Sequence, residues 1–407
     1  IESLLRLMDL AGVRWERDTV VWPAVERSAG VYAIPATNRA AWDQARKRYG
    51  IHTLGVLCYD HPLFGRPPEK FGAYSREVAR LLAGTVDDFE VWNEPGGFGN
   101  VSPVEYIGLL EAAYLGVKAG NPAATVVGLG GAAAGGWNGW YLPQIVQAGK
   151  HGFMDTFSIH PYCSPASLEV GYPTEGAPAP LANLENGDAL TGGALAAIQQ
   201  AHGGGERPRM WISEVGWPTT EVSPVGQAQA VSRAYITAAS LPQLYARMFL
   251  YDVLCDGTDL DEKEHTFGLL LHDYSVRPAY VAFANTARAI DGRPFLRRLH
   301  HPDPTVRLIL FGPEDAPLLA AWCTEVSPQE VISGKTADGQ DARALNRVGG
   351  RLDHAVDVGF RTAAAEVTLT DWQGRTSRRS PEAGTLSLHL TTWPVTVQGV
   401  EAVLTLS

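Results

Sequence analysis

The stretch FEVWNEP at residues 89–95 decides the fold of this 407-residue chain. Its first four residues are apolar or aromatic except for Glu90, which predicts a short buried strand. Pro95 has no backbone N–H and cannot continue a strand ladder, so the strand must end before it. Asn93 and Glu94 are therefore expected at the carboxyl end of a strand, where parallel α/β sheets and barrels carry their chemistry.

A second stretch, MWISEVGW at residues 210–217, repeats this arrangement. It places Glu214 at the end of another predicted strand, far along the chain from Glu94. Two carboxylic acids at the ends of two barrel strands are what glycoside hydrolysis requires.

Strand and helix signals alternate regularly over the first part of the chain. Seven predicted strands, each followed by a helix, cover residues 13–17, 52–59, 89–92, 124–130, 155–162, 209–214 and 247–253. This pattern predicts a TIM-type (β/α)8 barrel over residues 1–292. Because the chain opens with helix signals at 3–10, we expect the first of eight strands to lie upstream of Ile1. A barrel lacking one strand would expose two unpaired edges.

The pattern changes after residue 292. Short alternating segments (RLILF, PLLAAWC, EVTLTDW and TLSLHL) follow one another with turn residues and no helix signals between them. They predict a smaller antiparallel β-sandwich domain over residues 305–407. A long loop at 164–188, rich in Pro, Gly and Ala, is expected to be functional or mobile.

Composition narrows the class of protein. The length suggests two domains, and the net charge of -11 argues against nucleic acid or an anionic membrane as a partner. No apolar run approaches the ~18 residues of a membrane-spanning helix. The four cysteines form no C-x-x-C pair, so we expect free thiols and no zinc site. The cysteines do not identify the compartment; an extracellular or periplasmic location is the expectation.

The residues WNEP at 92–95, together with Glu214 on a later strand, resemble the clan A glycoside hydrolases, most closely the family 39-like members. The resemblance covers roughly residues 10–290, which correspond to a barrel, and more loosely the residues that follow them. It implies a retaining hydrolase in which Glu94, on the fourth strand, is the acid/base and Glu214, on the seventh, is the nucleophile. The sequence contains no H-x-H or H-E-x-x-H motif, which argues against a metallohydrolase barrel, and we expect no cofactor and no metal ion.

The same resemblance assigns roles to four further residues. Arg17 matches the clan's second-strand arginine, which would donate to the nucleophile and keep it ionised. Asn93 matches the partner of the sugar 2-hydroxyl. His160 and Tyr162, in SIHPY, match an H-x-Y motif whose tyrosine would touch the nucleophile and whose histidine would line the sugar pocket.

Several aromatic residues are candidates for stacking on sugar rings, although each alone is also a reasonable packing residue. They are Trp217, Tyr59, Trp137, Trp140 and Tyr251. Trp217 and Tyr59 come nearest to predicted strand ends.

Two other signals do not indicate sites. The glycine-rich run at 128–131 lacks the acid expected roughly 20 residues beyond a dinucleotide loop, which favours close strand–helix packing. The acidic run at 252–262 lacks the spacing of a calcium loop.

The sequence therefore predicts an O-glycosyl hydrolase acting on an oligosaccharide or polysaccharide, by exo or endo attack. The alternative is a carbohydrate-binding barrel without catalytic activity.

Overall fold

A computed structural model describes residues 1–97, 100–131, 141–173, 181–400 and 405–406. These residues form two compact units. The first comprises residues 1–161, 186–215 and 243–250, and the second comprises 162–185, 216–242 and 251–407.

The first unit is built on one parallel sheet whose strands follow one another in chain order. The strands are β1 (Trp15–Val21), β2 (His52–Cys58), β3 (Asp88–Val91), β4 (Thr125–Gly128), β5 (Thr156–Ile159), β8 (Met210–Ile212) and β9 (Tyr245–Met248). All seven predicted strands are present, and the curled parallel sheet confirms the TIM-barrel class. The additional strand expected upstream stays a prediction.

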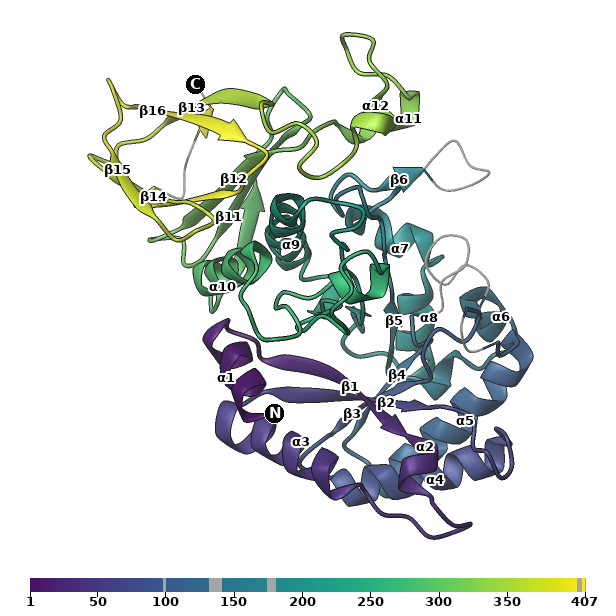
Figure 1. The fold of residues 1–407 in the computed structure, drawn as a ribbon. Coiled ribbons are helices and arrows are strands. Elements are labelled where there is room, and N and C mark those ends of the chain that lie inside the picture. The colour runs from purple at the N-terminus through teal and green to yellow at the C-terminus, as the bar shows by residue number, and fades with distance from the viewer. Residues whose placement is uncertain (98–99, 132–140, 174–180, 401–404, 407) are drawn as a thin grey trace. The chain divides into compact units, whose positions relative to one another are not determined.

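Helices connect these parallel strands, as barrel topology requires. They are α1 (Glu2–Leu10), α2 (Trp22–Val25), α3 (Ala36–Tyr49), α4 (Pro68–Leu82), α5 (Pro103–Gly120), α6 (Tyr141–Gln147), α7 (Gly187–Leu190) and α8 (Ala194–Ala201), with 3-10 turns η1 (His151–Phe153) and η2 (Leu184–Asn186). Helix α5 begins with the capping box that the sequence encodes, because Ser102 and Glu105 satisfy each other's backbone N–H groups. Figure 1 shows α3, α4 and α5 beside the sheet.

The curl of the sheet is visible in contacts between strands that are distant in its order. The ring of Trp15 on β1 lies 5.4 Å from that of Trp211 on β8 and 6.4 Å from that of Phe249, just after β9. These aromatic rings close one end of the sheet over a shared core with Leu54 and Val127.

The second unit contains antiparallel sheets, as predicted. The larger sheet has the strand order β10 (Phe295–Arg298), β11 (Val306–Phe311), β12 (Leu318–Cys323), β17 (Val395–Gln398), β14 (Val367–Thr370) and β15 (Thr376–Arg379). The others pair β16 (Thr385–Thr391), β13 (Ala355–Arg361) and β18 (Thr405–Leu406), and β6 (Tyr172–Pro173) with β7 (Leu181–Ala182). The helices of this unit are α9 (Pro224–Ala239), η3 (Lys263–Thr266), α10 (Pro278–Ile290), α11 (Pro328–Ser333) and α12 (Ala342–Leu345).

Alternating side chains give the larger sheet two apolar faces. Leu308 and Leu310 of β11 point into a core shared with Phe360 of β13 and the leucines of β16. Ile309 and Phe311 belong instead to a cluster with Ile236 of α9 and residues of α10, two helices that lie beside β11 and β12 in Figure 1. The second unit thus includes helices that the sequence assigns to the barrel, and the domain boundary at 292–305 stays a prediction.

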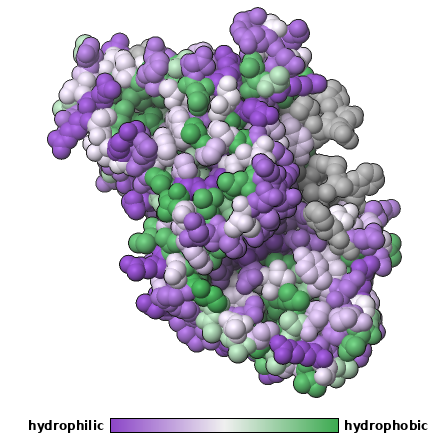
Figure 2. Space-filling model, viewed as in Figure 1, coloured by the Kyte–Doolittle hydropathy of each residue, from purple (hydrophilic) through white to green (hydrophobic). Residues whose placement is uncertain are grey.

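No helix among the described residues is both long and apolar enough to cross a membrane. Hydrophilic residues cover most of the face drawn in Figure 2, with hydrophobic residues interspersed. All four cysteines are free and buried.

Candidate active site

Backbone hydrogen bonds beyond the strand ends hold both candidate glutamates in place. After β3, the N–H of Trp92 donates to Leu57 at 3.0 Å and that of Glu94 donates to Gly130 at 2.7 Å. After β8, the N–H of Ser213 donates to Ile159 at 3.2 Å. Each glutamate is therefore fixed relative to a neighbouring strand.

The chain leaves β3 through an unusual conformation. Trp92 has φ 70° and Glu94 has φ 42°, both in the left-handed region that side chains other than glycine seldom adopt. Each such residue costs on the order of 1–3 kcal/mol and persists where the surrounding structure enforces it, which is common at functional sites. This turn presents the Glu94 side chain at the end of the strand.

The two predicted carboxylates lie close together. One oxygen of Glu94, one oxygen of Glu214 and one ring nitrogen of His160 all lie within 4.8 Å of one another. The side chains of Glu94 and Glu214 retain exposures of 18% and 16%. Both acids are therefore partly accessible from solvent and within reach of one small reacting group.

Arg17 of β1 binds three groups with one guanidinium. Its Nη1 donates to Glu214 Oε2 at 3.1 Å, its Nη2 to Asn93 Oδ1 at 2.6 Å, and its Nε to Glu90 Oε2 at 2.7 Å. The predicted contact between Arg17 and Glu214 is present. The planar fork of an arginine suits this arrangement, since a lysine offers only a point charge.

Glu90 is a third carboxylate of the site, and it is not among the residues predicted for it. It is fully buried, and Ser158 Oγ donates to its Oε1 at 2.5 Å. Burial alone would raise the pKa of Glu90, but the Arg17 charge, His160 and hydrogen bonds from Ser158 and Ser213 more than offset this and lower the pKa. Glu90 is therefore an ionised buried group. A charged residue between the apolar Phe89 and Val91 was the available signal.

His160 lies close to both Glu94 and Glu214. Its side chain is fully buried, with Nδ1 2.8 Å from Glu94 Oε1 and 3.8 Å from Glu214 Oε2. Its Nε2 lies 3.0 Å from Ser213 Oγ. The imidazole thus contacts the predicted acid/base directly, and its predicted contact with a sugar stays a prediction.

The glycine-rich run after β4 makes room for this imidazole. Gly131 has φ 64°, and a Cβ at that position would overlap the His160 ring. A Cβ on Gly130 would overlap the carbonyl group of Trp92. The run at 128–131 therefore allows close approach of the site's own residues, and the strand–helix packing expected for it stays a prediction.

Asn93 directly precedes Glu94 in the chain, and Tyr59 is a neighbour of Asn93. Asn93 accepts from Arg17 through Oδ1 and also hydrogen-bonds Tyr59. The Tyr59 side chain packs edge-on against Trp92, and the residue is 42% exposed. Burial of its hydroxyl, followed by the nearby Cys58, raises the pKa of Tyr59 to about 12. An exposed ring that contacts Trp92 and Asn93 suits the predicted stacking role.

The other predicted aromatic residues belong to the second unit. Tyr162 and Tyr251 both pack edge-on against Phe267, and the Tyr251 hydroxyl donates to Asp256 at 2.5 Å. Trp217 is only 1% exposed, and its indole N–H donates to the Ala166 carbonyl at 2.7 Å. The printed contacts of Trp217 and Tyr251 are those of packing residues, and the sugar contacts proposed for these two stay predictions. The contact proposed between Tyr162 and the nucleophile Glu214 also stays a prediction. Trp137 and Trp140 lie outside the described residues.

The donor set of Glu94, His160 and Glu214 has the composition of a metal site. However, the Arg17 guanidinium already donates to Glu214, and its positive charge would repel a cation there. The arrangement fits an acid and nucleophile pair better than a metal centre.

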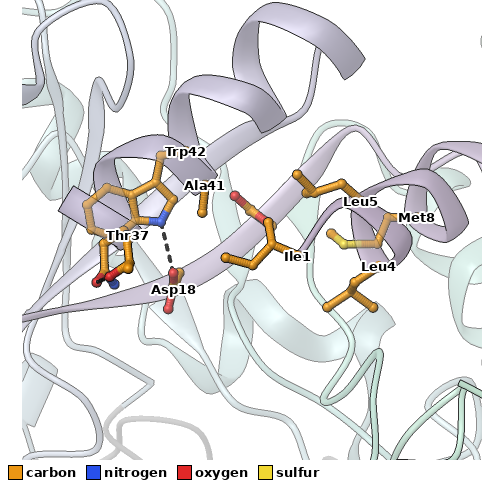
Figure 3. A pocket seen from close by; sticks show the side chains of 10 residues that line it. Ile1, Leu4, Leu5, Met8, Asp18, Thr37, Ala41 and Trp42 are labelled. Atoms are coloured by element: carbon orange, nitrogen blue, oxygen red, sulfur yellow. Dashed lines mark hydrogen bonds between the residues drawn. The ribbon is translucent and has the colours of Figure 1, made fainter. Parts of the chain in front are cut away.

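A separate cavity of about 260 Å³ lies in the first unit. Figure 3 shows Ile1 with Leu4, Leu5 and Met8 of α1 on one side of it, and residues of α3 on the other. Glu16 and Asp18 of β1 also line it. Asp18 accepts a hydrogen bond from the Trp42 indole at 2.8 Å (Figure 3).

Comparison with solved structures identifies the fold. A family 39 glycoside hydrolase from the gut symbiont Bacteroides cellulosilyticus WH2 superposes with a TM-score of 0.82 at 26% identity, over 98% of this chain and 77% of that one. A glucosidase from Croceicoccus marinus matches with a TM-score of 0.61 at 13% identity, over 97% and 91% of the two chains. A family 30 endoxylanase from Clostridium papyrosolvens C71 matches with a TM-score of 0.59 at 13% identity, over 98% and 92%.

No protein-family model matches the sequence, and no curated protein matches it. The structural neighbours nevertheless agree with one another. The chain has the clan A glycoside hydrolase fold with a family 39-like arrangement, and these neighbours support glycosidase activity.

Proposed function

We propose that this protein is a retaining glycoside hydrolase that cleaves O-glycosidic bonds in an oligosaccharide or polysaccharide. Glu94 is the acid/base and Glu214 is the nucleophile. A carbohydrate substrate of this kind fits an extracellular or periplasmic location.

The reaction has two steps, formation of a glycosyl-enzyme and its hydrolysis. A Glu214 oxygen attacks the anomeric carbon while the bond to the leaving oxygen breaks, and Glu94 gives that oxygen its proton. Glu94 then takes a proton from water, whose oxygen attacks the anomeric carbon and releases Glu214. Two inversions leave the anomeric configuration unchanged.

The distance between the two carboxylates carries the proposal. Retaining enzymes hold their carboxyl groups roughly 5–5.5 Å apart, whereas inverting enzymes leave roughly 6.5–9.5 Å for an intervening water molecule. One oxygen of Glu94 lies within 4.8 Å of one oxygen of Glu214, and so close an approach of the two side chains supports direct attack by a nucleophile.

The partners of each acid support the assignment of roles. Arg17 donates to Glu214, which favours the charged form that a nucleophile needs. Glu94 lies against the imidazole of His160. The Asn93 amide accepts from the same Arg17 guanidinium that donates to Glu214, which supports its proposed role as the partner of the sugar 2-hydroxyl.

A screen of aryl glycosides and polysaccharides, followed by NMR of the first product formed, tests the proposal. We expect a product with retained anomeric configuration and no turnover by Glu214→Ala. Glu69→Ala, which removes an exposed carboxylate of α4, serves as the control and should stay active. An inverted product would overturn the mechanism, and binding without turnover of any glycoside would favour a carbohydrate-binding barrel.

A further inference from the structure

A chain of hydrogen bonds runs from Glu94 into the interior of the first unit. Glu94 Oε1 lies 2.8 Å from His160 Nδ1, and His160 Nε2 lies 3.0 Å from Ser213 Oγ. Ser213 in turn hydrogen-bonds the buried carboxylate of Glu90. His160, Ser213 and Glu90 are each at most 3% exposed, so solvent does not supply alternative partners.

The positions of the hydrogen atoms in this series of hydrogen bonds can be assigned by starting from Glu90. Glu90 is ionised and can only accept, so Ser213 must donate its single hydroxyl hydrogen to Glu90. The Ser213 oxygen is then an acceptor toward His160. His160 must therefore carry a hydrogen on Nε2.

The tautomer of His160 determines how this residue can contact Glu94. When His160 is neutral and carries its hydrogen on Nε2, its Nδ1 has a lone pair and no hydrogen. Each oxygen of an ionised carboxylate likewise has lone pairs and no hydrogen. Two acceptors 2.8 Å apart repel unless a proton lies between them. The contact is thus stable only while the Glu94–His160 pair holds that additional proton.

We propose that Ser213 and Glu90 fix His160 as the Nε2–H tautomer, and that His160 is thereby a positioning residue that retains the proton of Glu94. This inference rests on the proposed acid/base role of Glu94. After the first step the pair has lost its proton, and the facing lone pairs favour its recovery from water. Recovery of a proton is what the second step requires of a general base.

The charged groups around the pair are Glu214, Glu90 and Arg17. Glu214 Oε2 lies 3.8 Å from His160 Nδ1, and Glu90 faces the ring from the side of Ser213. Arg17 bonds to both of these carboxylates and offsets part of their charge. The tautomer of His160 therefore depends on hydrogen bonding more than on an unbalanced charge.

Ser213→Ala tests the proposal, with Ser158→Ala as the matched control. Both serines are buried and hydrogen-bond Glu90, but Ser213 is the one that contacts His160. Without Ser213, His160 is free to move its hydrogen to Nδ1 and donate to an ionised Glu94. We expect the basic limb of the kcat/KM profile to move to lower pH by about one unit in Ser213→Ala, and to stay within a few tenths of a unit in Ser158→Ala.

NMR of ¹⁵N-histidine-labelled protein at mildly alkaline pH gives a readout that does not need activity. The His160 signals are assigned by their loss in His160→Gln. We expect the Nε2–H form in the parent and Ser158→Ala proteins, and the Nδ1–H form in Ser213→Ala. An Nδ1–H parent, or a Ser213→Ala protein that keeps Nε2–H, would overturn the proposal whether or not the protein hydrolyses glycosides.

Discussion

Arg17 Nη1 lies 3.1 Å from Glu214 Oε2, although four strands separate β1 from β8 in the order of the sheet. The contact exists because the sheet curls. The same guanidinium binds Glu90 and Asn93, so it joins a buried carboxylate to two predicted site residues. Its shape therefore matters as well as its charge.

Arg17→Lys keeps the charge but removes the fork. We expect kcat/KM to fall about 100-fold, which corresponds to about 2.7 kcal/mol, because one ammonium cannot hold Glu90, Asn93 and Glu214 together. Steady-state kinetics on the best substrate measures this. Arg14→Lys, which alters an exposed ion pair with Asp9, should leave the rate unchanged. A fully active Arg17→Lys protein would show that the fork is dispensable.

Gly131→Ala should damage the site more than the fold. The added methyl group would displace the His160 ring and with it the partner of Glu94, so we expect kcat/KM to fall at least ~100-fold. The free energy of unfolding should fall by about 1–3 kcal/mol from the clash and the left-handed backbone.

Gly149→Ala separates these two causes. Gly149 has φ 67°, close to that of Gly131, but open space where a Cβ would stand. It should lose only about 1 kcal/mol of stability and no activity. Equal loss of activity in both variants would indicate that backbone strain, not the position of His160, is responsible.

The sequence predicts which residues stand at the strand ends of the site better than it predicts the buried contacts beneath them. Glu94 and Glu214 could be placed because strand ends follow from local patterns of apolar residues and proline. The buried pairing of Glu90 with Arg17, Ser158 and Ser213 could not, because it needs four strands to meet. Burial of an aromatic residue is equally a tertiary property, as Trp217 illustrates. Local sequence shows where a strand ends but not what packs over it.

Glu94→Ala should affect substrates according to their leaving groups. Natural glycosides need protonation of the leaving oxygen, so we expect kcat/KM to fall about 10²–10⁴-fold on them. Activated aryl glycosides need no proton, so their first step should survive while the glycosyl-enzyme accumulates. Stopped-flow release of the aryl group should then show a burst followed by slow turnover. Uniform loss across all leaving groups would contradict the acid role.

Glu16, which is not one of the two candidate catalytic glutamates, makes a pH-dependent contribution to the free energy of unfolding. Its carboxylate lines the cavity beside α1 and accepts from Thr53 Oγ1 at 2.8 Å. Burial raises the pKa of Glu16 to about 7, with a further increase from Asp18, against the lowering effect of Thr53. The folded protein therefore binds this proton more tightly than the unfolded chain does. Stability should fall as pH rises from the ordinary value of about 4.5 to about 7, and the loss should stay constant above that.

Glu16→Gln removes this titration while keeping the shape of the side chain. At about pH 4 the folded parent keeps Glu16 neutral, as the variant is at every pH, so the two proteins should be similar in stability there. By about pH 8 the variant should be more stable than the parent by about 3 kcal/mol, since only the parent then holds a half-buried charge. Urea unfolding at several pH values measures the difference. The stability curve of Glu69→Gln, at an exposed position of α4, should run parallel to that of the parent. A Glu16→Gln curve that also runs parallel would mean that Glu16 is ionised in the folded protein at the same pH as in the unfolded chain.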